Sequence, residues 1–173
     1  MKCAEKRNEI MSVAMELLAE RGFHRVPMSL IAARAEVAVG TIYLYFAGKD
    51  ELITELFQEL EREIVTMLRE EFPADGSIRE RFLYLTGKIL RYFINNPLQF
   101  RYLEQFMNSP YGVSVRRDRL LDKSGRDDFF MTLFNEAVAA RIVKDIPVSA
   151  LFSLTIAPLI FLVRDHVLGF VTL

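Results

Sequence analysis

The sequence predicts an all-α fold, with an N-terminal three-helix head that contains a helix-turn-helix and a C-terminal helical bundle as the body. Along most of the 173 residues, apolar side chains recur with the spacing of an amphipathic helix. No segment shows the sustained alternation of apolar and polar residues that is typical of a half-buried strand. Breaks containing glycine or proline divide the periodic segments. A chain of this length is large enough to bury a substantial core.

The N-terminal part of the chain is predicted to form the head and a long connecting helix. The apolar stripe of the first helix includes Ile10 and Leu17, and Gly22 ends that helix. In the third helix, Ile42 and Phe46 lie four residues apart and are expected to face inward. The connecting helix has one apolar side and one charged side. Helices are therefore expected over about residues 4–21, from Pro27, over 39–46 and over 49–72.

The C-terminal part begins after Pro73–Gly76, the clearest break in the sequence. Ser77 is a predicted N-cap, with Glu80 at the spacing of a capping box. The last helix is apolar on nearly every side, which is typical of a helix that is buried all round. Further helices are expected over residues 78–94, 98–107 and 127–143 and from Leu151 to Leu173, with a break at 108–112 and a loop or frayed helix over 116–126.

The segment 27–52 reads as two short helices joined by a tight turn and followed at once by a third helix. Ala32 and Ala35 are small enough to let the next helix cross closely, and Val37 is the bulky apolar residue of the corner. With Ile42 and Phe46 facing inward, the second short helix turns its other side chains outward. Two helices arranged in this way form a helix-turn-helix, whose second helix enters the major groove of DNA.

This segment resembles the tetracycline-repressor (TetR) family of transcriptional regulators. The resemblance covers Ile10 to Leu56 and rests on Ile31, Ala32, Ala35, Val37, Gly40, Thr41, Ile42, Tyr43, Tyr45, Phe46, Lys49 and Leu52. It implies that Val39, Gly40, Tyr43 and Leu44 meet base edges of DNA. It also implies that Ser29, Thr41, Tyr45 and Lys49 contact the sugar–phosphate backbone.

The chain departs from the family pattern at two positions of the motif. The family usually has glycine where this chain has Glu36, and often has serine where it has Ala38. A non-glycine residue in a left-handed turn costs about 1 kcal/mol, and a carboxylate beside DNA repels phosphate. These departures keep open an alternative, in which the chain is a helical small-molecule-binding or scaffold protein that no longer reads DNA. A further alternative places Tyr43 and Tyr45 in a small aromatic core.

Composition narrows the class of protein and its compartment. The net charge is −1, and residues 1–49 carry only a small positive excess, so charge alone does not predict nucleic-acid binding. Cys3 is the single cysteine, and charged residues occur throughout the first twenty positions, which argues against a secretory signal. We expect a cytoplasmic protein. The apolar run Ile146–Val163 contains two prolines and is interpreted as a buried helix, so no membrane partner is expected.

No catalytic or metal-binding constellation is visible in the sequence. His24 and His166 are far apart, and no cluster of Cys, His or acidic residues has metal-ligand spacing. Asp165 and His166 are adjacent on a predicted helix and therefore do not face each other. We expect no enzyme activity, no metal and no cofactor.

The C-terminal part is rich in aromatic residues, which suits an adaptable apolar pocket, although such residues at helical spacing are more often core. The resemblance implies a small effector that binds the body and releases DNA. The predicted effector-binding residues are Phe93, Tyr102, Phe106, Tyr111, Phe130 and Phe134.

The predicted organisation is a DNA-binding domain over residues 1–48, a connecting helix over 49–72 and an effector-binding and dimerisation domain over 73–173. The expected function is a repressor that binds an inverted-repeat operator in double-stranded DNA as a homodimer and is released by a small apolar effector. Bodies of the family often close with two long helices, and only one is evident here. The chain is therefore either a compact variant or lacks a C-terminal segment.

Overall fold

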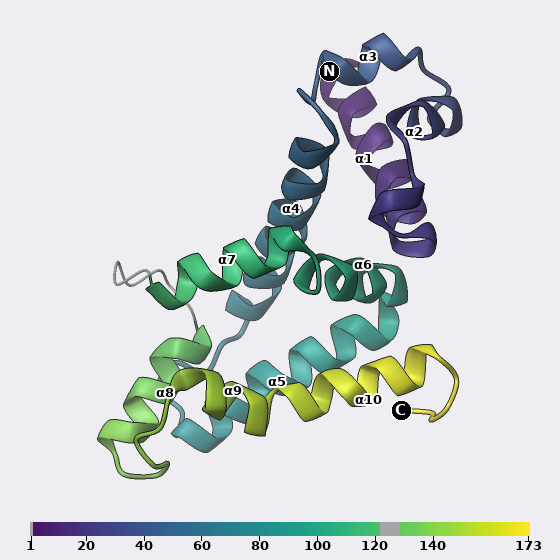
Figure 1. Cartoon of the computed structure of the whole chain (residues 1–173). Coiled ribbons are helices and arrows are strands. Elements are labelled where there is room, and N and C mark those ends of the chain that lie inside the picture. The colour runs from purple at the N-terminus through teal and green to yellow at the C-terminus, as the bar shows by residue number, and fades with distance from the viewer. Residues whose placement is uncertain (1, 122–128) are drawn as a thin grey trace. The chain divides into compact units, whose positions relative to one another are not determined.

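The computed structural model describes residues 2–121 and 129–173 and is helical throughout its regular structure (Figure 1). Within those ranges there is no strand, so the predicted all-α class is confirmed. The predicted loop or frayed helix over 116–126 is helical as far as Leu121, and its remainder lies outside the described residues.

The chain divides into two compact units. The first contains Met1–Glu63 and Leu98–Leu121, and the second contains Ile64–Pro97 and Asp122–Leu173. These boundaries differ from the predicted division at residues 48 and 72, because residues 98–121 group with the head. The functions assigned to the predicted domains stay predictions.

The first unit contains the helix-turn-helix and packs around α1. Ile10, Leu18, Ile31 and Ile42 have no exposed surface and form part of its core. The predicted helices of the head are confirmed to within a few residues at each end. The helices of this unit are α1 (Lys2–Arg21), the 3₁₀ turn η1 (Phe23–Arg25), α2 (Met28–Arg34), α3 (Val39–Tyr43), the N-terminal part of α4 (Lys49–Arg69), α6 (Pro97–Met107) and α7 (Pro110–Leu121).

The turn between α2 and α3 has the left-handed backbone that the sequence predicts. Glu36 has a φ of 54°, and its side chain is exposed. The turn is closed by two backbone hydrogen bonds, from Ala35 N–H to Ile31 O at 2.9 Å and from Val37 N–H to Ala32 O at 3.0 Å. The motif therefore keeps its geometry at a cost of about 1 kcal/mol for a side chain in this conformation.

Helix α7 begins inside the segment that the sequence predicts as a break. Pro110 occupies the first position of the helix, where its missing N–H costs nothing. Gly112 permits the close turn from α6, because a Cβ there would lie 2.2 Å from Phe106 O and 2.5 Å from Met107 Cα. The predicted break over 108–112 is thus shorter than expected.

The second unit packs α5 (Ile78–Asn95) against α8 (Phe129–Ala139) and α10 (Ala157–Val167), with α9 (Val148–Thr155) beside α8 and α10. The predicted capping box at the start of α5 is confirmed, since Ser77 N–H donates to Glu80 Oε2 at 2.8 Å and Glu80 N–H donates to Ser77 Oγ at 3.3 Å. Two apolar clusters form the core, one around Leu85 and Leu133 and one around Phe134 and Leu151.

The closing segment is two helices instead of the single helix that the sequence predicts. Pro158 has no N–H with which to continue the helical ladder, and α9 ends at Thr155. After α10, the backbone turns at Gly169, where φ is 80°. Several large apolar side chains of this segment are exposed, namely Phe152, Leu154, Phe161, Leu162, Leu168, Phe170, Val171 and Leu173.

The interpretation of this segment as a buried helix is wrong for a single chain. By length and composition, Val148–Val167 is apolar enough to cross a membrane, and only 17% of the window is buried within the chain. Exposed apolar side chains gathered in one segment are typical of an interaction surface.

Candidate DNA-binding site

Helix α3 separates its side chains into a buried face and an exposed face. Ile42 and Phe46 are buried in the head and fix the helix against it. On the other side, the exposed fractions of Val39, Tyr43 and Leu44 are 40%, 52% and 82%. Tyr43 therefore lies outside any aromatic core, in contrast to the alternative interpretation.

Gly40 lies on the same exposed face. We call the surface formed by Val39, Gly40, Tyr43 and Leu44 the outer surface of α3. A Cβ added to Gly40 would have no neighbouring atom within 4 Å. The fold of the chain therefore gives no steric reason for a glycine here. Close approach of an external molecule would supply one.

The predicted backbone-contacting residues lie around this surface. Ser29 is exposed in the first turn of α2, whereas Thr41 and Tyr45 are half-buried. The ring of Tyr45 lies 6.4 Å from that of Phe46, so part of Tyr45 is packed against the head. Their hydroxyl groups are of the kind that binds phosphate oxygens.

Lys49 is the first residue of α4, directly after the helix-turn-helix. Leu52 N–H donates to Gly48 O at 3.1 Å, so the helical ladder starts at Gly48. Partial burial lowers the pKa of Lys49 below its usual value, and the adjacent charge of Asp50 opposes this shift. A cation at a helix N-terminus, beside unpaired backbone N–H groups, suits a phosphate contact.

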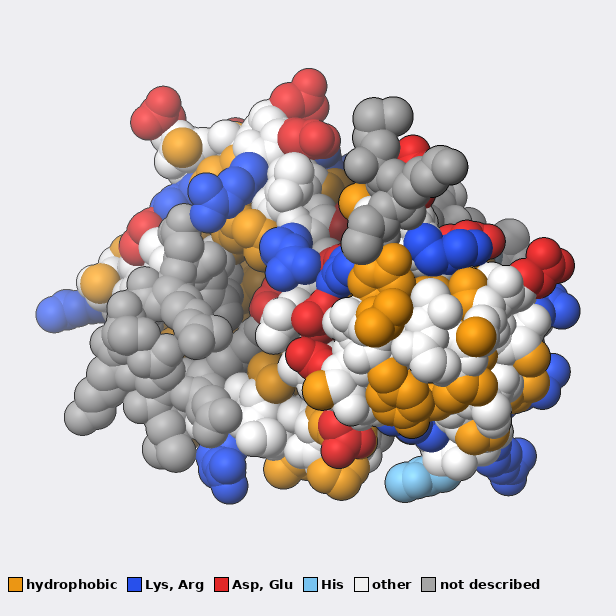
Figure 2. Space-filling model, turned by 90° about the horizontal axis from the view of Figure 1, so that it is seen from above, with side chains coloured by type: hydrophobic (Ala, Val, Ile, Leu, Met, Phe, Trp, Pro, Cys, Tyr) orange, Lys and Arg blue, Asp and Glu red, His pale blue; other side chains and the backbone are white. Residues whose placement is uncertain are grey.

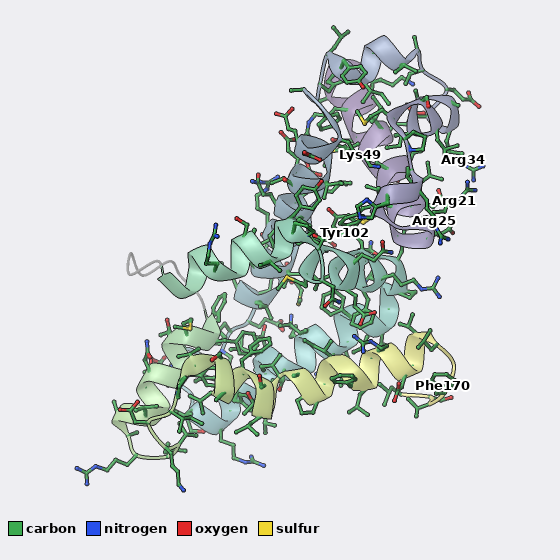
Figure 3. The ribbon with its side chains drawn as sticks, in the orientation of Figure 1. Arg21, Arg25, Arg34, Lys49, Tyr102 and Phe170 are labelled. Atoms are coloured by element: carbon green, nitrogen blue, oxygen red, sulfur yellow. The ribbon has the colours of Figure 1, made fainter. Side chains whose placement is uncertain are left out.

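Figure 3 shows further cations of the head, which the sequence analysis did not single out. Arg21, Arg25 and Arg34 extend from the flank formed by α1, η1 and α2, whereas Lys49 lies at the start of α4. Arg34 forms an exposed ion pair with Glu16 at 3.6 Å. Viewed from above, the right-hand part of the surface shows hydrophobic side chains with both basic and acidic side chains around them (Figure 2).

Arg7 ties three segments of the head together and was missed by sequence reasoning. Its guanidinium donates to Glu59 Oε1 at 2.7 Å and to Glu55, and it lies 5.4 Å from the ring centroid of Phe46. The hydrogen bond to Glu59 is the main cause that raises the pKa of Arg7. Since Phe46 lies two residues after Leu44, these contacts hold the end of α3 close to α1 and α4. Only the spacing of Glu55 and Glu59 on one helix face hints at this in the sequence.

Three of the predicted effector residues lie in the first unit. Tyr102 and Phe106 have no exposed surface, and Phe106 stacks on Phe57 with ring centroids 4.0 Å apart. The Tyr102 hydroxyl donates to Ile53 O at 2.5 Å, and burial raises the pKa of Tyr102. These contacts join α6 to α4 through a packed aromatic core.

Tyr111 extends the same core to the first turn of α4. Its hydroxyl donates to Asp50 Oδ1 at 2.5 Å, and this bond raises the pKa of Tyr111 to about 12. Tyr111 therefore stays neutral at physiological pH and keeps its proton for the carboxylate. Nearby, Gln105 Nε2 donates to Ala19 O at 2.8 Å and fixes α6 to the end of α1.

The other three predicted effector residues lie in the second unit. Phe93 is buried on α5, and the rings of Phe130 and Phe134 are 6.4 Å apart on α8. Phe130 is only partly buried and packs against both apolar clusters of this unit. The six residues thus belong to two separate units, and their assignment to an effector site stays a prediction.

Comparisons with known proteins agree with this geometry. Residues 10–56 match the family model described as bacterial regulatory proteins, tetR family. An HTH-type transcriptional regulator of Haemophilus influenzae is 27% identical over 157 residues, which are 91% of this chain and 81% of that protein. The fatty acid metabolism regulator protein of Bacillus subtilis is 34% identical over 83 residues, or 48% of this chain. This chain spans only 43% of the length of that regulator.

A solved structure extends the similarity to the fold of the whole chain. The transcriptional regulator FadR from Bacillus subtilis, in complex with stearoyl-CoA, superposes with a TM-score of 0.73. The match covers 93% of this chain and 87% of that structure, at 20% identity. At that identity the likeness concerns the fold alone.

Proposed function

The chain belongs to the tetR family of bacterial regulatory proteins, and from this premise we propose that it is a repressor that binds an inverted-repeat operator as a homodimer and is released by a small effector. The related proteins are transcriptional regulators and not enzymes, as expected from the sequence. Such a protein acts on chromosomal DNA and is expected in the cytoplasm.

The observation that carries the proposal is the outer surface of α3. Its apolar side chains are exposed, and its glycine has no steric role within the chain. A scaffold protein that no longer reads DNA has no physical reason to keep this arrangement. The helix-turn-helix also keeps its hydrogen-bonded turn despite the strained backbone of Glu36.

Replacing Lys49 by alanine is expected to weaken binding to all DNA sequences alike. Log affinity falls as log salt rises, and losing one phosphate contact makes this fall shallower by about one unit of slope. The measurement is a titration of fluorescent duplexes at several salt concentrations. Lys144→Ala, which removes an exposed cation of the second unit, serves as the control and should leave the slope unchanged. Equal slopes for wild type and Lys49→Ala would contradict the assignment of Lys49.

For the effector, we propose an apolar or acyl-chain compound that binds in the second unit. Support comes from the aromatic residues of α8, since Phe130 packs against both apolar clusters there and Phe134 is a buried member of one of them. The stearoyl-CoA bound to FadR shows an acyl compound held by a protein of the same fold. Tyr102 and Phe106 then act as core residues of the first unit.

This proposal predicts that Phe130→Ala and Phe134→Ala reduce the response to an effector. A series of acyl-CoA and fatty acid compounds is tested for release of the protein from DNA. Any active compound should need about tenfold higher concentration in these variants, which corresponds to about 1.4 kcal/mol of lost binding. Val143→Ala, a further change beside the same cluster, controls for a general loss of packing. An unchanged response in both phenylalanine variants would exclude this location.

A further inference from the structure

The outer surface of α3 contains no side chain of the type that makes paired hydrogen bonds to bases. Arginine and lysine read guanine, asparagine and glutamine read adenine, and acidic residues read cytosine. Helix α3 consists of Val39, Gly40, Thr41, Ile42 and Tyr43, followed by Leu44. Among these residues, only the hydroxyls of Thr41 and Tyr43 can form side-chain hydrogen bonds.

The exposed apolar side chains instead match the one apolar group in the major groove. Leu44 has 82% of its surface exposed and lies directly after the helix, while Val39 is exposed at its start. Thymine alone presents a methyl group in the major groove, and apolar side chains make specific contacts with it. Covering that methyl removes apolar surface of both partners from water, which is favourable.

Gly40 makes such contacts sterically feasible. Valine is a short side chain, so the backbone of α3 has to lie close to the bases for Val39 to reach a methyl group. Gly40 follows Val39 directly and adds no side chain to this surface, and its Cβ position is open. The glycine and the two aliphatic side chains thus form a shallow, uncharged surface.

We propose that the head recognises thymine in its operator through the 5-methyl group, with Leu44 and Val39 as the contacting residues. This inference rests on the proposed DNA-binding function and specifies which base that function selects. Sequence preference then comes from van der Waals contact with the methyl group and from its burial. The residues around the outer surface of α3 contact the phosphates.

The test replaces single thymines of the selected operator by deoxyuridine, which differs from thymidine only in lacking the methyl group. At the contacted positions, each replacement should weaken binding by about fourfold, the effect of one buried methylene-sized group. Changing such a thymine to cytosine should weaken binding, and 5-methylcytosine at that position should restore part of the loss.

Protein variants identify the residues that sense the methyl group. Leu44→Ala or Val39→Ala should abolish the difference in affinity between thymine and uracil at the operator base that the replaced residue contacts. The control is Leu83→Ala, an exposed leucine of α5 in the second unit, which should retain the full difference.

Two results would overturn the inference. In the first, deoxyuridine has no effect at any position, although the protein still selects an operator. In the second, the difference between thymine and uracil persists in both Leu44→Ala and Val39→Ala. Failure of the wild-type protein to bind any duplex would instead refute the proposed function itself, so the two failures are distinguishable.

Discussion

Replacing Leu154 and Phe161 together by aspartate is expected to convert the proposed homodimer into monomers. These side chains are 71% and 57% exposed on α9 and α10, within a segment that a single chain leaves largely uncovered. Large exposed apolar patches mark interaction sites. In a dimer, binding of the first head to DNA raises the local concentration of the second. Loss of the dimer should therefore reduce operator affinity by about 10²-fold or more.

Light scattering at micromolar concentration measures the mass, and titration with an inverted-repeat duplex measures the affinity. Ile142→Asp, an exposed apolar residue after α8, is the matched control and should leave both values unchanged. A monomeric wild-type protein would contradict the dimer. So would stable partitioning of the wild type into lipid vesicles, because Val148–Val167 would then be covered by lipid.

Replacing Gly40 by alanine is expected to stabilise the protein and to impair its function at the same time. Alanine is favoured over glycine within a helix by about 1 kcal/mol, and the added Cβ meets no atom of the chain. On the DNA-facing side, the same methyl group keeps α3 from approaching the bases. We expect at least about a tenfold loss of operator affinity, equivalent to about 1.4 kcal/mol.

Thermal unfolding and operator titration separate these two effects. Gly87→Ala, within α5, is the matched control, since its Cβ would meet only the end of the flexible Arg91 side chain at 3.4 Å. That control should gain stability and bind DNA as the wild type does. Unchanged DNA binding in Gly40→Ala would show that α3 does not lie close to the duplex.

The head was predictable because its signals are local in the sequence. Periodic apolar residues, the helix end at Gly22 and the inward pair Ile42 and Phe46 each depend on positions a few residues apart. The capping box of Ser77 and Glu80 is local in the same way and appears as predicted. The strained conformation of Glu36 could also be anticipated, because the turn itself requires it.

The remaining features depend on contacts between distant segments. An aromatic residue at helical spacing is predicted to be buried, but its partner is not specified by that spacing. Tyr102 bonds to a carbonyl 49 positions away, at Ile53, and so belongs to the first unit. Arg7 likewise pairs with Glu55 and Glu59 on another helix. The composition of the closing segment predicted its apolar character, but a single chain does not bury it.

Selection of bound duplexes from a randomised pool tests most directly whether this protein reads DNA as a dimer. The account predicts enrichment of an inverted repeat whose half-site centres lie about one helical turn, roughly 34–36 Å, or a multiple of it, apart. The enriched duplex should also bind more weakly as salt rises. Recovery of no enriched sequence, with equal and weak binding of all duplexes, would contradict the account.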